Sequence, residues 1–284
     1  MFWIRKNLKN MLVCMITLGL LIPVNTGQAR AQTEIDLQAL DAYLTESVKN
    51  NRIQGLAVGI VQGDQVIFTN GYGSTSLGEA ATSDTQFFIG SVSKPFTALA
   101  VLQLVDEGLI DLDAPVQDYI PWFQVADPKA SAEITIRNLL NHTSGLSENG
   151  DRNASIYAPN LEEQGRLLKD AHLTAPVGTK FQYYNQNYRL LGLVIEEVSG
   201  MSYSDYIQSH IFEPLNMTRS AADPKNAPDL AQAYTRFFGF AVPVQQPYNP
   251  GALPSGYLIS TAEDLSKFLI AQIQNRKPDG TQLL

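Results

Sequence analysis

The spacing of hydrophobic residues predicts a helix followed by two strands near the start of the chain. The helix spans Ile35 to Ile53, because apolar residues recur there at close to 3.6 positions. The apolar runs 56–61 and 66–68 then read as strands, and Gly63-Asp64 between them is a turn signal. We therefore expect an antiparallel hairpin after the first helix.

Beyond residue 91 the pattern is almost entirely helical. Four segments carry one apolar side at helical spacing and end or begin at a recognisable cap: 91–108, Ile134 to Leu140, Tyr188 to Val198, and the helix that opens at Thr261. A two-stranded hairpin is not stable alone, so further strands are needed. The chain reaches Leu284 without supplying a convincing set. We therefore expect the chain to be incomplete.

The first 31 residues have the layout of a secretory signal peptide. Arg5, Lys6 and Lys9 form a basic start, Met11 to Val24 is an apolar run, and small residues at 29 and 31 offer a cleavage site. An uncleaved anchor is the alternative, but the run is short for a membrane span. We expect residues 1–31 to be removed, the product to be secreted or periplasmic, and the mature chain to have no stable membrane span.

Composition narrows the classes of partner for the mature chain, residues 32–284, which we expect to form one domain. Of 20 basic residues 16 remain, against 28 acidic ones, so the net charge is about −12 and nucleic acid is disfavoured. Cys14 is the only cysteine and lies in the leader, which excludes thiolate catalysis. His142, His172 and His210 lack metal-ligand spacing, so we expect no metal and no cofactor.

Ser91 and Lys94 are the first candidates for chemistry. They lie three positions apart at the start of a predicted helix, where residues i and i+3 share a face. A serine needs a base to become a nucleophile, and a buried lysine with a lowered pKa can serve as one. The alternative is a serine that caps the helix and a lysine in solvent, and the spacing alone does not separate the two readings.

Tyr183 and Asn185 form a second candidate pair, in a predicted loop before the helix at Tyr188. A tyrosine beside a lysine cation has a favoured phenolate and can shuttle a proton. The Asn185 amide can donate to a substrate carbonyl and accept from a lysine. Alternatively, the aromatic residues of this segment simply pack the core.

Five segments together resemble the serine β-lactamase-related family, which includes class C β-lactamases, D-alanyl-D-alanine carboxypeptidases and related esterases. In chain order they are Ser91-Val92-Ser93-Lys94, 134–146, 183–188, 211–217 and 256–264, and the resemblance covers about residues 35–275. It implies an α+β fold of the β-lactamase/transpeptidase type: an antiparallel sheet with flanking helices, whose C-terminal strands are missing here, plus a helical domain, with the site between them.

The resemblance also implies roles for individual residues. Ser91 is the acylated nucleophile, Lys94 its proton acceptor, Tyr183 the general base, and Asn185 a group that positions substrate. Tyr184 stands where the family usually has a serine, and Asn187 where it often has a glycine. We expect these two departures to reshape the substrate groove.

A third family motif, a lysine or histidine followed by one residue and a glycine, is expected on a strand that also supplies an oxyanion-hole amide. The chain stops at Leu284 before such a motif, so we expect a truncated product with weak activity or none.

The function implied is an exported serine hydrolase that forms an acyl-enzyme on amide or ester bonds. Its substrate would be a peptidoglycan peptide, a β-lactam or a small ester. The alternative is a catalytically weak or inactive penicillin-recognising module. A serine–histidine triad through His142 is disfavoured, because no Gly-x-Ser-x-Gly elbow occurs, and we interpret His142 as a structural loop residue.

Overall fold

The computed structural model describes residues 35–76, 78–154 and 156–284, so the predicted signal peptide at 1–31 lies outside the described residues. Contacts group Gln38–Leu284 into one compact unit. Helix α1 spans Leu37–Asn50 and is followed by strands β1 (Gly55–Gln62) and β2 (Gln65–Ser76). The strands pair in antiparallel order around Gly63, whose φ of 64° suits the tight turn. The predicted helix and hairpin are confirmed.

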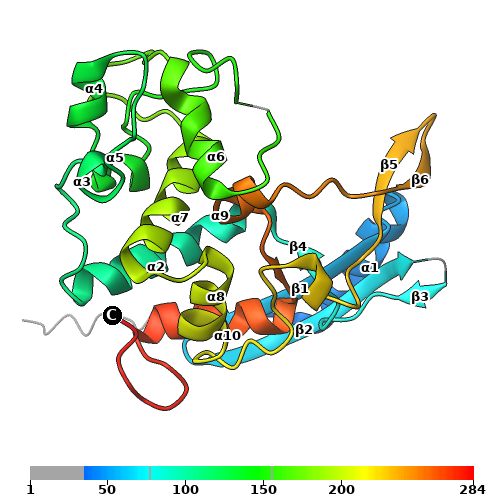
Figure 1. The fold of residues 1–284 in the computed structure, drawn as a ribbon. Helices are drawn as coiled ribbons and strands as arrows, with labels where there is room; N and C mark the ends of the chain where they lie inside the picture. The colour runs from blue at the N-terminus through cyan, green and yellow to red at the C-terminus, as the bar shows by residue number, and fades with distance from the viewer. Residues whose placement is uncertain (1–34, 77, 155) are drawn as a thin grey trace, which may run out of the picture. The chain divides into compact units, whose positions relative to one another are not determined.

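Helices cover both faces of this hairpin (Figure 1). Directly paired strand residues share a face, so Gly59 and its partner Thr69 face away from Asn70 and Tyr72. Asp41 of α1 accepts hydrogen bonds from Asn70 (2.8 Å) and Tyr72 (2.6 Å) on one face. On the other face α10 (Ala262–Gln274) packs so closely that a Cβ at Gly59 would meet its Ser266.

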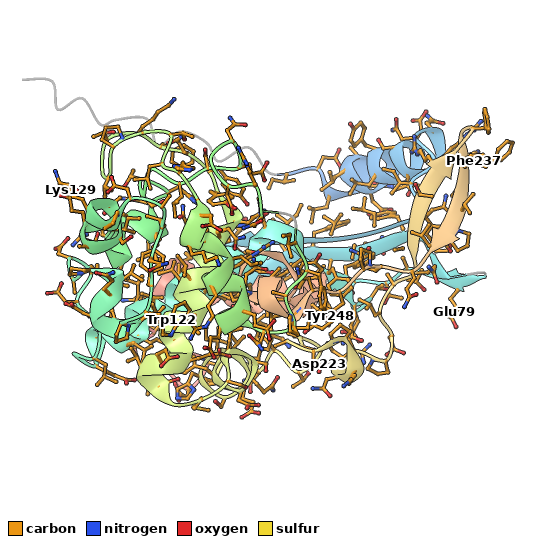
Figure 2. All side chains as sticks on the ribbon, turned by 45° about the horizontal axis from the view of Figure 1, so that its top comes forward. Glu79, Trp122, Lys129, Asp223, Phe237 and Tyr248 are labelled. Atoms are coloured by element: carbon orange, nitrogen blue, oxygen red, sulfur yellow. The ribbon has the colours of Figure 1, made fainter. Side chains whose placement is uncertain are left out.

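The strand β3 (Glu79–Ala80) extends the sheet to the order β1-β2-β3. Two further antiparallel pairs occur in the described part of the chain: β4 (Phe87–Phe88) with β7 (Ile259–Ser260), and β5 (Ala233–Phe237) with β6 (Phe240–Val244). Figure 2 shows Phe237 at the outer end of the β5–β6 hairpin.

The expectation of almost no strand after residue 91 was therefore wrong. The β5–β6 turn is made by Phe238 and Gly239, both with positive φ, at 47° and 83°. Such turns are usually signalled by Asn or Asp before the glycine, and the phenylalanine hides the signal.

The remaining chain is mainly helical. The α-helices, in order, are α2 (Ser93–Asp106), α3 (Val116–Tyr119), α4 (Pro128–Glu133), α5 (Ile136–Leu140), α6 (Leu161–Arg166), α7 (Asn185–Ser199), α8 (Tyr203–Ile207) and α9 (Leu253–Gly256). The shorter helical turns are η1 (Gly90–Val92), η2 (Leu167–Asp170), η3 (Gln208–Phe212), η4 (Pro224–Asn226) and η5 (Pro250–Ala252). None of the helices in the described ranges combines the length and apolar character needed to cross a bilayer.

The helices α2 and α7 lie at the centre of the hydrophobic core and contact each other. Phe96 of α2 stacks on Phe268 of α10 with ring centroids 4.0 Å apart, and its edge meets Phe212 at 5.7 Å. The helix α7 ends at Gly200, which has φ 70° as a left-handed C-terminal residue. This packing fixes the starts of α2 and α7, which carry the candidate residues.

The architecture confirms the predicted α+β class, with antiparallel strands and flanking helices. One boundary differs in a way that matters for the site. The helix α7 begins at Asn185 rather than Tyr188, with Tyr184 as its N-cap residue. The apolar periodicity starts only at Tyr188, so the polar first turn carried no hydrophobic signal.

Candidate active site

Ser91 lies in the single turn η1 that leads into α2 (Ser93–Asp106). Gly90 before it has φ 54°, a conformation that favours glycine, and this bend leaves Ser91 exposed. The N-cap residue of α2 is Val92, with no side-chain cap hydrogen bond. Ser91 is thus not the N-cap of α2, and the reading of this motif as a helix cap is wrong.

Lys94 is buried beneath Ser91, with only 5% of its surface exposed. Its Nζ lies 3.4 Å from the Ser91 Oγ, 2.8 Å from the Asn185 Oδ1 and 2.6 Å from the carbonyl oxygen of Ser255. The alternative of a lysine in solvent is therefore wrong as well. Burial lowers the pKa of Lys94, and contact with Tyr183 only partly offsets this effect. The lysine is held where a neutral amine can accept a proton from Ser91.

Tyr183, which directly precedes the N-cap residue of α7, contacts the same Ser91 hydroxyl. Its Oη donates to the Ser91 Oγ at 2.7 Å, and the Lys94 Nζ lies 4.8 Å from the centre of its ring. Partial burial raises the pKa of Tyr183, but the contacts with Lys94 and Ser91 and the charge of Lys94 outweigh it, so the pKa is lowered overall. Half of the side chain, 49%, is exposed, so the phenol can face a bound substrate.

All four residues predicted for the site, Ser91, Lys94, Tyr183 and Asn185, therefore meet at one place. The side chain of Asn185, the first residue of α7, contacts Lys94 through its oxygen. Its amide nitrogen remains as a donor. The arrangement can remove a proton from Ser91 by two routes and return one to a leaving group.

The two departures from the family pattern do not line the groove, contrary to expectation. Tyr184 and Asn187 are both buried. The Tyr184 phenol donates to the carboxylate of Asp151, and Asn187 accepts from Ser144 at 2.8 Å. Each side chain points into the interior, where it has a polar hydrogen-bond partner. Their effect is to tie α7 to the loop that follows α5.

His142 is the residue whose importance the sequence did not reveal. It has φ 59°, and its imidazole lies 4.7 Å from the Tyr183 ring and 5.2 Å from that of Tyr188, between centroids. The backbone N–H of Tyr184 donates to Nδ1 at 3.3 Å, so Nδ1 is an acceptor and the ring proton belongs on Nε2. Burial and the nearby Lys94 charge lower the pKa of His142 to about 4. A neutral imidazole therefore packs against the ring of Tyr183.

Ser255 of α9 is the second contributor that the sequence did not indicate. It holds Lys94 through its backbone carbonyl, which any residue could supply, so its identity carries no signal. Beside it, Tyr257 meets Phe88 edge to face at 5.9 Å and Tyr248 at 5.8 Å. The rings of Phe88 and Tyr248 thus pack against Tyr257, which directly follows α9 in the chain.

The chain belongs to the beta-lactamase family, because the family model named Beta-lactamase matches residues 40–284. The chain is 30% identical over 242 residues to Protein flp of Staphylococcus aureus (strain COL), covering 83% of this chain and 49% of that protein. It is also 30% identical over 254 residues to Penicillin-binding protein 4 of Amycolatopsis lactamdurans, covering 87% of this chain and 66% of that one.

Among solved structures, the octameric penicillin-binding protein homologue from Pyrococcus abyssi superposes with a TM-score of 0.76 and 32% identity. The match covers 85% of this chain and 57% of that one. The chain thus spans about half to two thirds of the length of these relatives. The family and the fold are shared, as the motifs predicted.

Proposed function

We propose that this protein is an exported serine hydrolase whose Ser91 attacks an amide or ester carbonyl and becomes acylated. The observation that carries the proposal is the Ser91 Oγ lying 2.7 Å from the Tyr183 Oη and 3.4 Å from the Lys94 Nζ. Membership of the beta-lactamase family supports the same reaction class. The substrates considered are a peptidoglycan stem peptide, a β-lactam and a small ester.

In the acylation step, the Ser91 Oγ forms a bond to the carbonyl carbon while its proton passes to the neutral amine of Lys94, or to Tyr183 when that residue is a phenolate. The Tyr183 phenol then delivers a proton to the leaving nitrogen or oxygen as the scissile bond breaks. The backbone N–H of Ser91 lies in the first turn of a helix, where N–H groups lack intrahelical partners, and it can donate to the developing oxyanion. Water, activated by the same pair, releases the acyl group.

A recognition module that is acylated but scarcely turns over is the second candidate. The tighter contacts of Lys94 favour it, because the Asn185 and Ser255 oxygens hold the ammonium more closely than Ser91 does. The 3.4 Å between the Lys94 Nζ and the Ser91 Oγ is at the long end for a hydrogen bond, so proton transfer between them is less direct and acylation slows accordingly.

Turnover measurements separate the two candidates. The protein is incubated with nitrocefin, a p-nitrophenyl ester and a peptide ending in D-alanyl-D-alanine, and product is compared with enzyme on a molar basis. A hydrolase releases many equivalents from at least one substrate, and Ser91→Ala abolishes the release. Release of at most one equivalent favours the recognition module. Equal rates for wild type and Ser91→Ala would overturn both candidates.

A further inference from the structure

A second cation, Arg189, lies beside the catalytic lysine and takes no part in the mechanism above. Arg189 follows Asn185 by four residues on α7, so the two side chains lie on one face of that helix. Asn185 contacts Lys94 directly. Arg189 is therefore placed one helical turn further along the same face.

Ser255 connects the two cations. Its carbonyl oxygen accepts from the Lys94 Nζ at 2.6 Å, and its hydroxyl oxygen accepts from the Arg189 Nε at 3.3 Å. The hydroxyl in turn donates to the carbonyl of Ala252 at 2.8 Å, which fixes its orientation. Arg189 thus hydrogen-bonds to Ser255, whose backbone carbonyl contacts Lys94.

The Arg189 guanidinium does not use all of its hydrogen-bond donors. Within the described residues its Nη1 is buried and has no hydrogen-bond partner. The carboxylate of Asp151 acts on it from a distance, but that carboxylate already accepts from the Tyr184 phenol and from the N–H of Asn153 at 2.8 Å. Arg189 as a whole is only partly buried, but a buried N–H without a hydrogen-bond partner costs stability, so a functional reason for it is worth seeking.

We propose that Arg189 is a positioning residue for Lys94, acting through their shared partner Ser255 and through its own positive charge. This inference rests on the proposed function, since it concerns how Lys94 becomes the base for Ser91. A cation next to a buried lysine disfavours the ammonium form, which is one of the ways proteins activate lysines. The charge of Arg189 acts in this direction on Lys94, in addition to burial.

The other groups around the pair do not supply the same effect. Lys94 faces the rings of Tyr183, Tyr188 and the neutral His142, while Arg189 is influenced by Tyr184, Asp151 and Tyr257. Tyr183 favours the ammonium of Lys94 rather than the amine. Among these groups Arg189 is the cation that opposes it.

The test is a direct titration of Lys94 in the intact chain by NMR, with lysine labelled at the ε-carbon and the resonance assigned through Lys94→Gln. The variant Arg189→Met keeps length and apolar bulk but removes the charge. We expect the Lys94 midpoint to rise, since a nearby positive charge that disfavours the ammonium is removed. Arg189→Lys should restore most of the wild-type midpoint. The matched control Arg166→Met, at an exposed arginine of α6, should leave it unchanged.

An unchanged Lys94 midpoint in a folded Arg189→Met protein would overturn the proposal. Folding is checked by thermal unfolding, whose midpoint we expect to be unaffected or improved because a buried N–H without a partner is removed. Ser255→Ala tests the other route: the carbonyl remains, so the midpoint should hold while the rate of Ser91 acylation by a fluorophosphonate falls severalfold. An unchanged acylation rate in Ser255→Ala would remove Ser255 from the account.

The outcome also separates this proposal from the proposed function. If the wild-type chain is not acylated but Arg189→Met still shifts the Lys94 midpoint, the hydrolase assignment fails and the coupling between the two cations stands. If Ser91 is acylated and the midpoint does not move, the hydrolase assignment stands and Arg189 has no such role.

Discussion

The hydroxyl oxygens of Tyr183 and Ser91 lie 2.7 Å apart, although 92 positions separate the residues along the chain. The contact joins the turn before α2 to the residue preceding the N-cap of α7, and the packing of these two helices in the core maintains it. Lys94 approaches the same serine from below. The candidate chemistry therefore depends on how precisely two helix starts are held.

Removing the Tyr183 hydroxyl should slow acylation without unfolding the protein. Tyr183→Phe retains the half-exposed ring but loses the proton donor to Ser91, and loss of a general acid–base group costs on the order of 10²–10⁴ in rate. The measurement is the labelling rate of Ser91 with a fluorophosphonate. Tyr43→Phe, at a tyrosine of α1 that is 67% exposed, is the control and should label at the wild-type rate. Equal rates for both variants would exclude Tyr183 from the mechanism.

Gly192 should prove essential for the position of Ser255. A Cβ at Gly192 of α7 would lie 2.2 Å from the Cγ of Pro254, so Gly192→Ala must push α9 away from α7. We expect a loss of about 1–3 kcal/mol in the free energy of unfolding and slower labelling of Ser91, because the Lys94 contact with Ser255 is disturbed. Urea denaturation measures the first effect. Gly256→Ala, where the nearest atom would be 3.7 Å away, should lose less than about 1 kcal/mol; similar losses in both would contradict the steric argument.

His142 should make stability depend on pH between about 4 and 6.5. Its pKa falls to about 4 in the folded protein, so in this range the unfolded chain binds a proton that the folded chain does not. Stability from this residue is therefore complete above pH 6.5 and is lost as the pH falls towards 4, by about 1–3 kcal/mol. His142→Asn, which tolerates the positive φ, should flatten this part of the pH dependence.

The control for this prediction is His172→Asn, at an exposed histidine, which should keep the wild-type dependence. The free energy of unfolding is measured by urea titration at several pH values for all three proteins. If the curves for wild type and His142→Asn run parallel, the imidazole is not neutralised by its surroundings.

Phe96 should be the largest single contributor to the packing beneath the site. It is fully buried, stacks on Phe268 and meets Phe212 edge to face. Phe96→Ala should lower the free energy of unfolding by about 3–5 kcal/mol, since it loses burial and leaves a cavity. Leu269→Ala, at a leucine of α10 that is 47% exposed, should lose less than about 1 kcal/mol. Comparable losses would show that the Phe96 cluster is not a tight core.

Four side chains of the site were predictable from the sequence. The spacing of Ser91 and Lys94 is local and reads directly as one helix face, and the order of motifs brought in Tyr183 and Asn185. Ser255 was not predictable, because it acts on Lys94 through its backbone. His142 was interpreted as a structural loop residue, and only the structure shows that the loop places its ring against Tyr183.

For the fold too, features with a local sequence signal were predictable and the others were not. Apolar runs on both sides of a glycine turn predict the first hairpin. The β5–β6 hairpin turns at Phe238, a residue that does not indicate a turn. The short β4–β7 pair forms between segments more than 170 positions apart, a contact that periodicity cannot report.

The most direct test of the central claim is the location of the acyl group after reaction with a fluorophosphonate or a fluorescent penicillin, determined by peptide mapping with mass spectrometry. We expect an adduct on the peptide that contains Ser91, absent from Ser91→Ala, formed much more slowly in Lys94→Gln, and unchanged in the control Ser209→Ala at an exposed serine. An adduct that persists in Ser91→Ala, or that maps to another residue in the wild-type protein, would contradict it.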